Sequence, residues 1–303
     1  MPIDLPQPIV FGDTSGDLSD HASGADQTIS LTANIGTRTL IGDANALLDH
    51  ATGDDDALTG FAIGISVVIG DATDISGHGR GGDDHVVAGA SGNADAVGDA
   101  ATMSGHAQGG NDFVEANSDF SANAYGDASV MTDHARGGND VVTGANGHGL
   151  VVLYGDAQTL SGFAVGGDDT LIATASSGAV GAGAVMYGDG AELLDHTKGG
   201  NDTLISGSGN DQMWGDAVTV AQTAQTGNDT FVFSAPNAHD TIEDFQPGKD
   251  HIELKGYEDI TNFDQLAPHI TDTAAGALIT FDPNDSILVA NDHHLTSGDF
   301  FFT

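Results

Sequence analysis

The sequence predicts an all-β protein, a right-handed parallel β-roll or β-solenoid with coils of about 28 residues, closed by a β-rich cap at its C-terminal end. Three observations support this fold class. A Gly-Asp step recurs regularly along the chain, a second acidic Gly-rich step follows it at a nearly constant offset, and short apolar segments keep fixed positions between the steps. Repeats of about 20–50 residues are typical of stacked folds, in which each unit packs only against its neighbours.

The two steps supply two rows of aspartates. Those of the first step, called here the Gly-Asp row, are Asp43, Asp71, Asp99, Asp127, Asp156, Asp189 and Asp216. Those that close the second step, called the Gly-Gly row, are Asp56, Asp84, Asp112, Asp140, Asp169, Asp202 and Asp229. The glycines that open the middle five second steps are Gly81, Gly109, Gly137, Gly166 and Gly199. Since coils stack in register, each row is expected to run along the solenoid.

We expect three segments along the chain. Residues 1–30 form a degenerate first coil or cap, because Gly12-Asp13 echoes the first step and terminal repeats are often atypical. Residues 31–230 carry the regular coils. Residues 231–303, where the period stops, form the C-terminal cap.

Three apolar columns accompany the steps. One precedes each Gly-Asp step: Ile41, Ile69, Val97, Tyr125, Tyr154, Tyr187 and Trp214. A second follows the same step at a fixed offset: Leu47, Ile75, Met103, Met131, Leu160, Leu193 and Val220. A third closely follows each Gly-Gly aspartate: Leu58, Val86, Val114, Val142, Leu171, Leu204 and Phe231. Stacking at the strand spacing of about 4.8 Å would make each column a buried ridge.

The charge limits the classes of partner. The net charge is −39, from 45 acidic and 6 basic residues, so we expect no nucleic-acid binding, which needs clustered Lys and Arg. No apolar run approaches the roughly 20 residues of a membrane-spanning helix, so we expect no membrane insertion. The chain has no cysteine, which excludes disulfides and thiolate metal sites. The first residues lack the basic flank and apolar run of a signal peptide.

The aspartate rows predict a cation site. Carboxylates repeated in every coil would lie about 4.8 Å apart, and like charges at that distance destabilise a fold. Ca²⁺ takes about 6–8 oxygen ligands from carboxylates and backbone carbonyls, whereas Mg²⁺ requires stricter geometry and retains its waters. The sequence therefore predicts several Ca²⁺ ions. For the Gly-Asp row a second interpretation stays open, in which each aspartate only forms a turn with its own backbone.

Residues 206–214, Ser-Gly-Ser-Gly-Asn-Asp-Gln-Met-Trp, match the nonapeptide G-G-x-G-x-D-x-U-x in all but the first position. The segment resembles the repeat of RTX, or haemolysin-type calcium-binding, proteins. The resemblance implies a parallel β-roll that holds Ca²⁺ between neighbouring turns. It adds Asp211, Gly207 and Gly209 to the candidate ligand turns.

This chain departs from the RTX pattern in two respects. The usual coil is two nonapeptides, whereas most coils here are longer, at about 28 residues, with the additional segment between the two turns. The resemblance therefore leaves open whether both turns of a coil bind calcium. Asp56 also lies in Gly53-Asp54-Asp55-Asp56, which lacks the second glycine.

The C-terminal segment is similar to the one that closes the β-roll of secreted RTX proteins, including serralysin-type proteases. The chain ends Asp299-Phe300-Phe301-Phe302-Thr303, an acidic residue followed by an apolar run. The resemblance implies an uncleaved type I secretion signal, the type I secretion machinery as a partner, and a secreted, extracellular or cell-surface location. The alternative is a last strand that packs on the cap.

A column of histidines occupies one further repeat position. Its members are His21, His50, His78, His106, His134 and His196, and Phe163 interrupts them. Stacked imidazoles could bind a transition metal or respond to pH. A half-exposed column that only packs and forms hydrogen bonds explains the pattern as well, and Phe163 favours that interpretation.

The sequence predicts a secreted calcium-binding repeat protein that folds on binding Ca²⁺. We expect a structural or interaction role at the cell surface or in the extracellular matrix, in adhesion, a biofilm or a surface layer, with a surface glycan or protein as a partner. We expect no enzyme, because H-E-x-x-H and G-x-S-x-G are absent. The alternative is a polysaccharide lyase or epimerase on the solenoid, marked by a cluster of unlike residues near 176–186. Ice binding would need flat ranks of threonine, and we expect no threonine column in the repeats.

Overall fold

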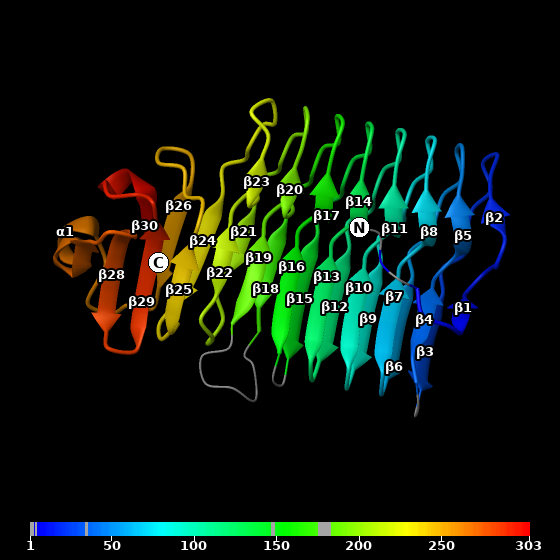
Figure 1. The fold of residues 1–303 in the computed structure, drawn as a ribbon, viewed down its shortest axis with the longest axis horizontal. Helices are drawn as coiled ribbons and strands as arrows, with labels where there is room; N and C mark the ends of the chain where they lie inside the picture. The colour runs from blue at the N-terminus through cyan, green and yellow to red at the C-terminus, as the bar shows by residue number, and fades with distance from the viewer. Residues whose placement is uncertain (1–2, 4, 34–35, 147–148, 175–182) are drawn as a thin grey trace.

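The computed structural model describes residues 3, 5–33, 36–146, 149–174 and 183–303, which wind into a parallel β-solenoid of about eight coils (Figure 1). In this part of the chain the strands form sheets of twelve, eight and ten strands. Each regular coil gives one strand to each sheet, and neighbours pair in parallel register with the strand one coil away. The predicted fold class is confirmed.

The twelve-stranded sheet ends in an antiparallel hairpin, and its strands in spatial order are β1 (Ile9–Phe11), β4 (Arg38–Ile41), β7 (Ile65–Ile69), β10 (Asn93–Val97), β13 (Ser121–Tyr125), β16 (Leu150–Tyr154), β19 (Ala184–Tyr187), β22 (Gln212–Trp214), β25 (His239–Ile242), β29 (Asp285–Ala290), β28 (Gly276–Asp282) and β27 (Ile270–Asp272). The ten-stranded sheet contains β3 (Thr28–Ala33), β6 (Ala57–Ala62), β9 (His85–Ala90), β12 (Phe113–Ser118), β15 (Val141–Asn146), β18 (Thr170–Ala173), β21 (Thr203–Ile205), β24 (Thr230–Ser234), β26 (His251–Lys255) and β30 (Phe300–Phe302). The eight-stranded sheet contains β2 (Asp17–Leu18), β5 (Ala44–Leu47), β8 (Ala72–Ile75), β11 (Ala100–Met103), β14 (Ala128–Met131), β17 (Ala157–Leu160), β20 (Glu192–Leu193) and β23 (Thr219–Val220).

The additional segment of the long coil forms an arm. After the turn at Gly70-Asp71, β8 runs outward, the chain reverses at its tip, and it returns through Arg80 to the turn that begins at Gly81. The returning segment forms its own ladder of single bridges, in which Arg80 pairs with Thr52 and Gln108 of the adjacent coils. Each arm therefore leaves and re-enters the solenoid between the two acidic turns of one coil.

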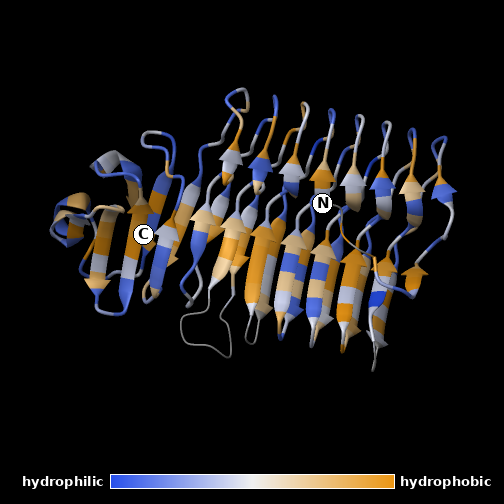
Figure 2. Ribbon diagram, viewed as in Figure 1, coloured by the Kyte–Doolittle hydropathy of each residue, from blue (hydrophilic) through white to orange (hydrophobic). Residues whose placement is uncertain are grey.

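Apolar and polar residues alternate along the strands of the two long sheets (Figure 2). The inward residues of these sheets form the main core, which includes all seven members of the third column, each fully buried. The second column forms a separate core inside the arms and is buried from Leu47 to Leu193. Val220 is 40% exposed, because β23 is the last strand of its sheet, so the prediction of a buried ridge is wrong at that position.

The first column lies on the outer side of the twelve-stranded sheet, where Ile3 and Leu5 pack against it. It is buried from Ile41 to Tyr154, whereas Tyr187 and Trp214 are half-buried. The aromatic members stack at ring-centroid distances of 4.8 to 5.1 Å.

The expectation that the repeats contain no threonine column is wrong. The strand register places Thr170, Thr203 and Thr230 in a single column of the ten-stranded sheet. This column is only three threonines long, because Val141 occupies the same position in the preceding coil and His251 occupies it in the following strand.

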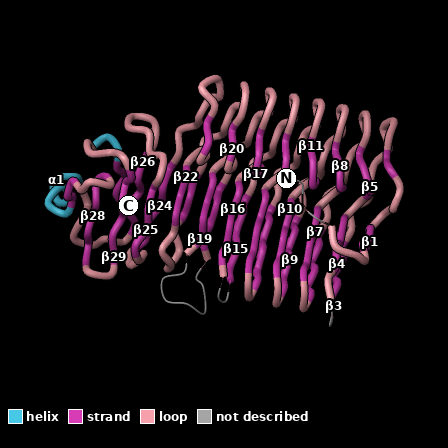
Figure 3. Tube along the Cα trace, viewed as in Figure 1, coloured by secondary structure: helices cyan, strands magenta, loops and turns pink. Residues whose placement is uncertain are grey.

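Helical turns occur at the C-terminal end, in α1 (Phe263–Leu266), η1 (Ala267–His269) and η2 (Ser297–Asp299) (Figure 3). There β27 and β28 turn antiparallel and end the parallel ladder of the twelve-stranded sheet. The terminal apolar run forms β30, which pairs with β26. This is the packing role that the sequence left as the alternative, and the secretion role stays a prediction. No described helix has the length and apolar character needed to cross a membrane.

Candidate metal centre

Both aspartate rows lie inside the protein, at the base of the arms. All fourteen side chains are at most 3% exposed. They are brought together because the arm starts at one acidic turn and ends at the other. The two rows that are separate in the sequence therefore form one buried double row.

The Gly-Gly row connects successive coils. In each coil the aspartate Oδ1 accepts a hydrogen bond from the backbone N–H of the same-row aspartate one coil earlier, at 2.7 to 2.9 Å from Asp56 through Asp229. In each coil, one oxygen of this carboxylate is thus hydrogen-bonded to a backbone N–H.

The Gly-Asp row joins the two turns of one coil. Asp99 Oδ1 accepts from the N–H of Gly110 at 2.9 Å, and Asp127 Oδ1 accepts from that of Gly138 at 2.7 Å. Each donor belongs to the second step of the same coil, across the base of the arm. The alternative of a local turn formed by the aspartate and its own adjacent backbone does not describe these contacts.

The second oxygen of most of these carboxylates has no partner. In the described part of the chain, twelve of the fourteen aspartates carry one buried oxygen without a hydrogen bond; the exceptions are Asp71 and Asp216. Asp71 contacts the N–H of Gly82 with both oxygens, and Asp216 accepts from the side chain of Gln246. Buried polar atoms are nearly always paired, so a double row of unpaired anionic oxygens indicates a ligand that accepts their lone pairs.

The glycines allow the close approach of these oxygens. A Cβ on Gly109 would lie 2.0 Å from Asp127 Oδ1 and 2.4 Å from Asp99 Oδ2, and the predicted glycines at the other second steps are equally crowded. A Cβ on Gly70 would lie 1.8 Å from the carbonyl oxygen of Gly98 and 1.9 Å from Asp84 Oδ2. Carboxylate and carbonyl oxygens therefore share the same small space, the mixed donor set that Ca²⁺ prefers.

Burial dominates the electrostatics of the double row. It raises the pKa of Asp127 to about 6, that of Asp56 to about 7 and that of Asp229 to about 8. For Asp84 and Asp140 burial raises the pKa well above the ordinary value, and neighbouring aspartates raise it further. Without a cation, these side chains therefore hold their protons to a higher pH in the fold than in the unfolded chain.

The donor set fits Ca²⁺ better than a metal that needs several convergent side chains. Among the described residues, no three His, Cys, Asp or Glu side chains converge on one point. An ion in the double row would take its carboxylates from adjacent turns and complete its shell with backbone carbonyls and water, which Ca²⁺ tolerates at about 6–8 ligands.

Asp211, the aspartate of the nonapeptide match, lies outside the double row. Its Oδ1 accepts from the N–H of Ala184 at 2.6 Å and its Oδ2 from that of Gly207 at 2.8 Å, so both oxygens are paired. Gly209 is buried in the same turn. Asp240 follows in the next coil, where its Oδ1 accepts from the N–H of Asp211 at 2.8 Å.

Two residues of the cap extend the double row. Asp250 Oδ1 accepts from the N–H of Asp229 at 3.0 Å, and Asp244 accepts from the N–H groups of Gly215 and Asp216. Burial raises the pKa of Asp250 to about 6 and that of Asp244 to about 7. The periodicity of the repeats predicts neither residue; the Gly-Lys-Asp segment that ends at Asp250 is the available signal in the sequence.

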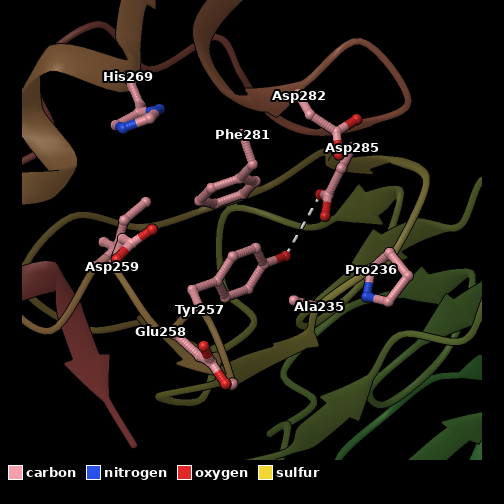
Figure 4. Close-up of a pocket in the computed structure, with 11 residues that line it drawn as sticks. Ala235, Pro236, Tyr257, Glu258, Asp259, His269, Phe281, Asp282 and Asp285 are labelled. Carbon is pink, nitrogen blue, oxygen red and sulfur yellow. Dashed lines mark hydrogen bonds between the residues drawn. The ribbon is translucent and has the colours of Figure 1, made fainter.

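A separate pocket of about 410 Å³ lies in the cap (Figure 4). Tyr257 and Phe281 form its aromatic side, with ring centroids 4.1 Å apart. The hydroxyl of Tyr257 donates to Asp285 at 3.4 Å, and Glu258 and other acidic residues also line the pocket. Residues 175–182, within the region where the rival enzyme would show its mark, lie outside the described residues.

A family model described as Peptidase M10 serralysin C terminal matches residues 47–300. Comparison with curated proteins and with solved structures gives no match. The repeats of this family are RTX-type and bind Ca²⁺, and the serralysin C-terminal domain is not the catalytic one. The match spans both aspartate rows from Asp56 onward and nearly all of the cap. This chain belongs to the serralysin C-terminal family of RTX-type repeat proteins.

Proposed function

We propose that this chain is a secreted calcium-binding repeat protein that folds when Ca²⁺ enters the double aspartate row. The observation that carries the proposal is the set of buried carboxylate oxygens without a hydrogen bond. Because the unfolded chain has no comparable site, the free energy of metal binding becomes free energy of folding.

The metal would supply positive charge between adjacent coils. The residues that would hold it are the aspartates of both rows, extended by Asp244 and Asp250, with nearby carbonyls such as that of Gly98. Each coil would add its own ligands, so folding and metal loading would propagate along the stack.

The test is circular dichroism of the purified chain in EDTA, in Ca²⁺ and in Mg²⁺. We expect a β-rich spectrum in Ca²⁺, loss of that spectrum in EDTA, and little recovery in Mg²⁺. A β-rich spectrum that does not respond to the chelator would refute calcium-dependent folding.

We further propose export by the type I secretion machinery, followed by a structural or interaction role at the cell surface or in the extracellular matrix. Family members of the serralysin type are secreted. Low cytosolic Ca²⁺ would leave the acidic chain unfolded for export, and external Ca²⁺ would fold it. Deletion of residues 295–303 should abolish export from a type I-competent host, whereas unchanged export would contradict this part of the proposal.

The polysaccharide-active enzyme remains the second candidate, because the cap pocket combines carboxylates with an aromatic side. Glycosidic cleavage by a carboxylate pair would need two of these acids at the substrate. Incubation of the calcium-loaded protein with acidic and neutral polysaccharides, followed by reducing-end and unsaturated-sugar assays, would identify it. If the protein has only a structural or interaction role, neither assay should detect a cleavage product.

A further inference from the structure

The histidine column lies on the outer tips of the arms, away from the double aspartate row. Five imidazoles follow one another without interruption, with ring centroids 4.9 to 5.0 Å apart from His21 to His134. Phe163 continues the stack at 5.0 Å and is followed by His196 at 5.2 Å. All of these side chains are exposed.

The backbone fixes the register of the column and leaves its nitrogens available. The N–H of His78 donates to the carbonyl of Asp49 at 2.6 Å, and that of His106 to the carbonyl of Gly77 at 2.7 Å. Asp49 and Gly77 adopt left-handed φ values of 59° and 71°, which form the tight tip. Within the described ranges no hydrogen bond or ion pair engages a ring nitrogen of these histidines.

We propose that adjacent imidazoles of this column bind borderline divalent metals, namely Cu²⁺, Ni²⁺ or Zn²⁺, as two-histidine sites. Imidazole nitrogen suits these ions, whereas the buried carboxylates suit Ca²⁺. The repeats therefore present imidazole nitrogens at the surface for borderline metals and carboxylate oxygens in the interior for Ca²⁺. The net charge of −39 raises the local concentration of both.

The spacing permits pairs but not larger clusters. Metal–nitrogen bonds of about 2.0–2.1 Å hold two nitrogens at most about 4.2 Å apart, so adjacent rings with centroids about 5 Å apart must turn their in-plane nitrogen lone pairs toward a common point. Exposed side chains achieve this by rotation about χ1 and χ2. No three ligands converge among the described residues, so water would fill the remaining coordination positions. Five consecutive histidines then provide two independent pairs.

The arrangement into pairs predicts a particular set of stoichiometries. His78→Gln removes the central ring but leaves His21–His50 and His106–His134, so two sites should remain. His50→Gln combined with His106→Gln isolates every ring of the run and should remove both sites. Phe163→His joins His196 to the run and should give three sites.

The experiment is titration with Cu²⁺ in saturating Ca²⁺, followed by calorimetry and by electron paramagnetic resonance. The double variant supplies the background from the other histidines, and circular dichroism verifies that every variant folds. We expect two additional sites in the wild type and in H78Q, three in F163H, and a signal from two nitrogens per copper. Equal binding by the wild type and the double variant would overturn the proposal and leave the column a packing device. Because folding is monitored separately, failure of calcium-dependent folding would be recognised as a different result.

Discussion

Replacing Asp127 by Asn should change the stability of the protein in opposite directions with and without Ca²⁺. The substitution preserves the shape of the side chain and an oxygen that can accept from Gly138. It removes the negative charge and replaces the unpaired Oδ2 with an amide. The metal-free fold loses an unfavourable buried charge, whereas the calcium-loaded fold loses a candidate ligand.

The magnitude follows from the pKa of Asp127, which burial raises from 3.8 to about 6. One pKa unit corresponds to about 1.4 kcal/mol, so keeping this carboxylate ionised in the metal-free fold costs about 3 kcal/mol at pH 7. Asp127→Asn should recover most of that. In Ca²⁺, a tenfold to hundredfold weaker site would instead destabilise the fold by about 1.4 to 2.8 kcal/mol.

The assay is urea unfolding in EDTA and in saturating Ca²⁺, followed by circular dichroism. If the chain is already unfolded in EDTA, it can be titrated with an osmolyte that is excluded from the protein surface and therefore favours folding. The osmolyte concentration needed for folding then ranks the stabilities of the variants. Asp83→Asn is the matched control, because Asp83 is exposed in an equivalent turn and Asn111 and Asn139 occupy its position in the next two coils. A change of the same sign in both conditions would refute the assignment of Asp127 to a metal-binding row.

Three further outcomes are expected. In EDTA, the stability of the fold should be greatest below about pH 4 and should be lost as the pH rises through the pKa values of Asp127, about 6, and Asp229, about 8. The reason is that the fold binds more protons than the unfolded chain. A metal-free fold that gains stability with rising pH would contradict this. Gly109→Ala should raise the Ca²⁺ midpoint of folding, because the new Cβ meets two carboxylates of the Gly-Asp row; an unchanged midpoint would show that the turn is not at a metal. Met131→Ala should cost about 2–5 kcal/mol in calcium-loaded urea unfolding, since the side chain is fully buried in the arms; Val220→Ala, at an exposed position of the same column, is the control and should cost little.

Sequence periodicity was sufficient for the fold class and for the alignment of the two rows. Asp84 and Asp112 fall one coil apart because the interval between their steps is constant, and the structure joins them by a backbone hydrogen bond. Burial of the third column followed from the same regularity, as at Val86.

The arms and the meeting of the two rows could not be obtained from spacing. The constant offset from Gly70 to Gly81 is visible in the sequence, but only tertiary packing decides that β8 runs outward and the chain returns beside it. Spacing could not predict Asp250 for a related reason. The repeat in the amino-acid sequence stops near residue 231, whereas parallel strand pairing continues from β24 to β26. A motif match also identified Asp211, whose oxygens are both paired by backbone N–H groups outside the double row.

The most direct test of the central claim is a crystal structure grown in Ca²⁺, with anomalous difference maps that identify the ions. Strong calcium peaks between the Gly-Asp and Gly-Gly rows, within about 2.3–2.6 Å of carboxylate and carbonyl oxygens, are the predicted result. Water alone between fully packed coils, with the carboxylates protonated, would contradict it.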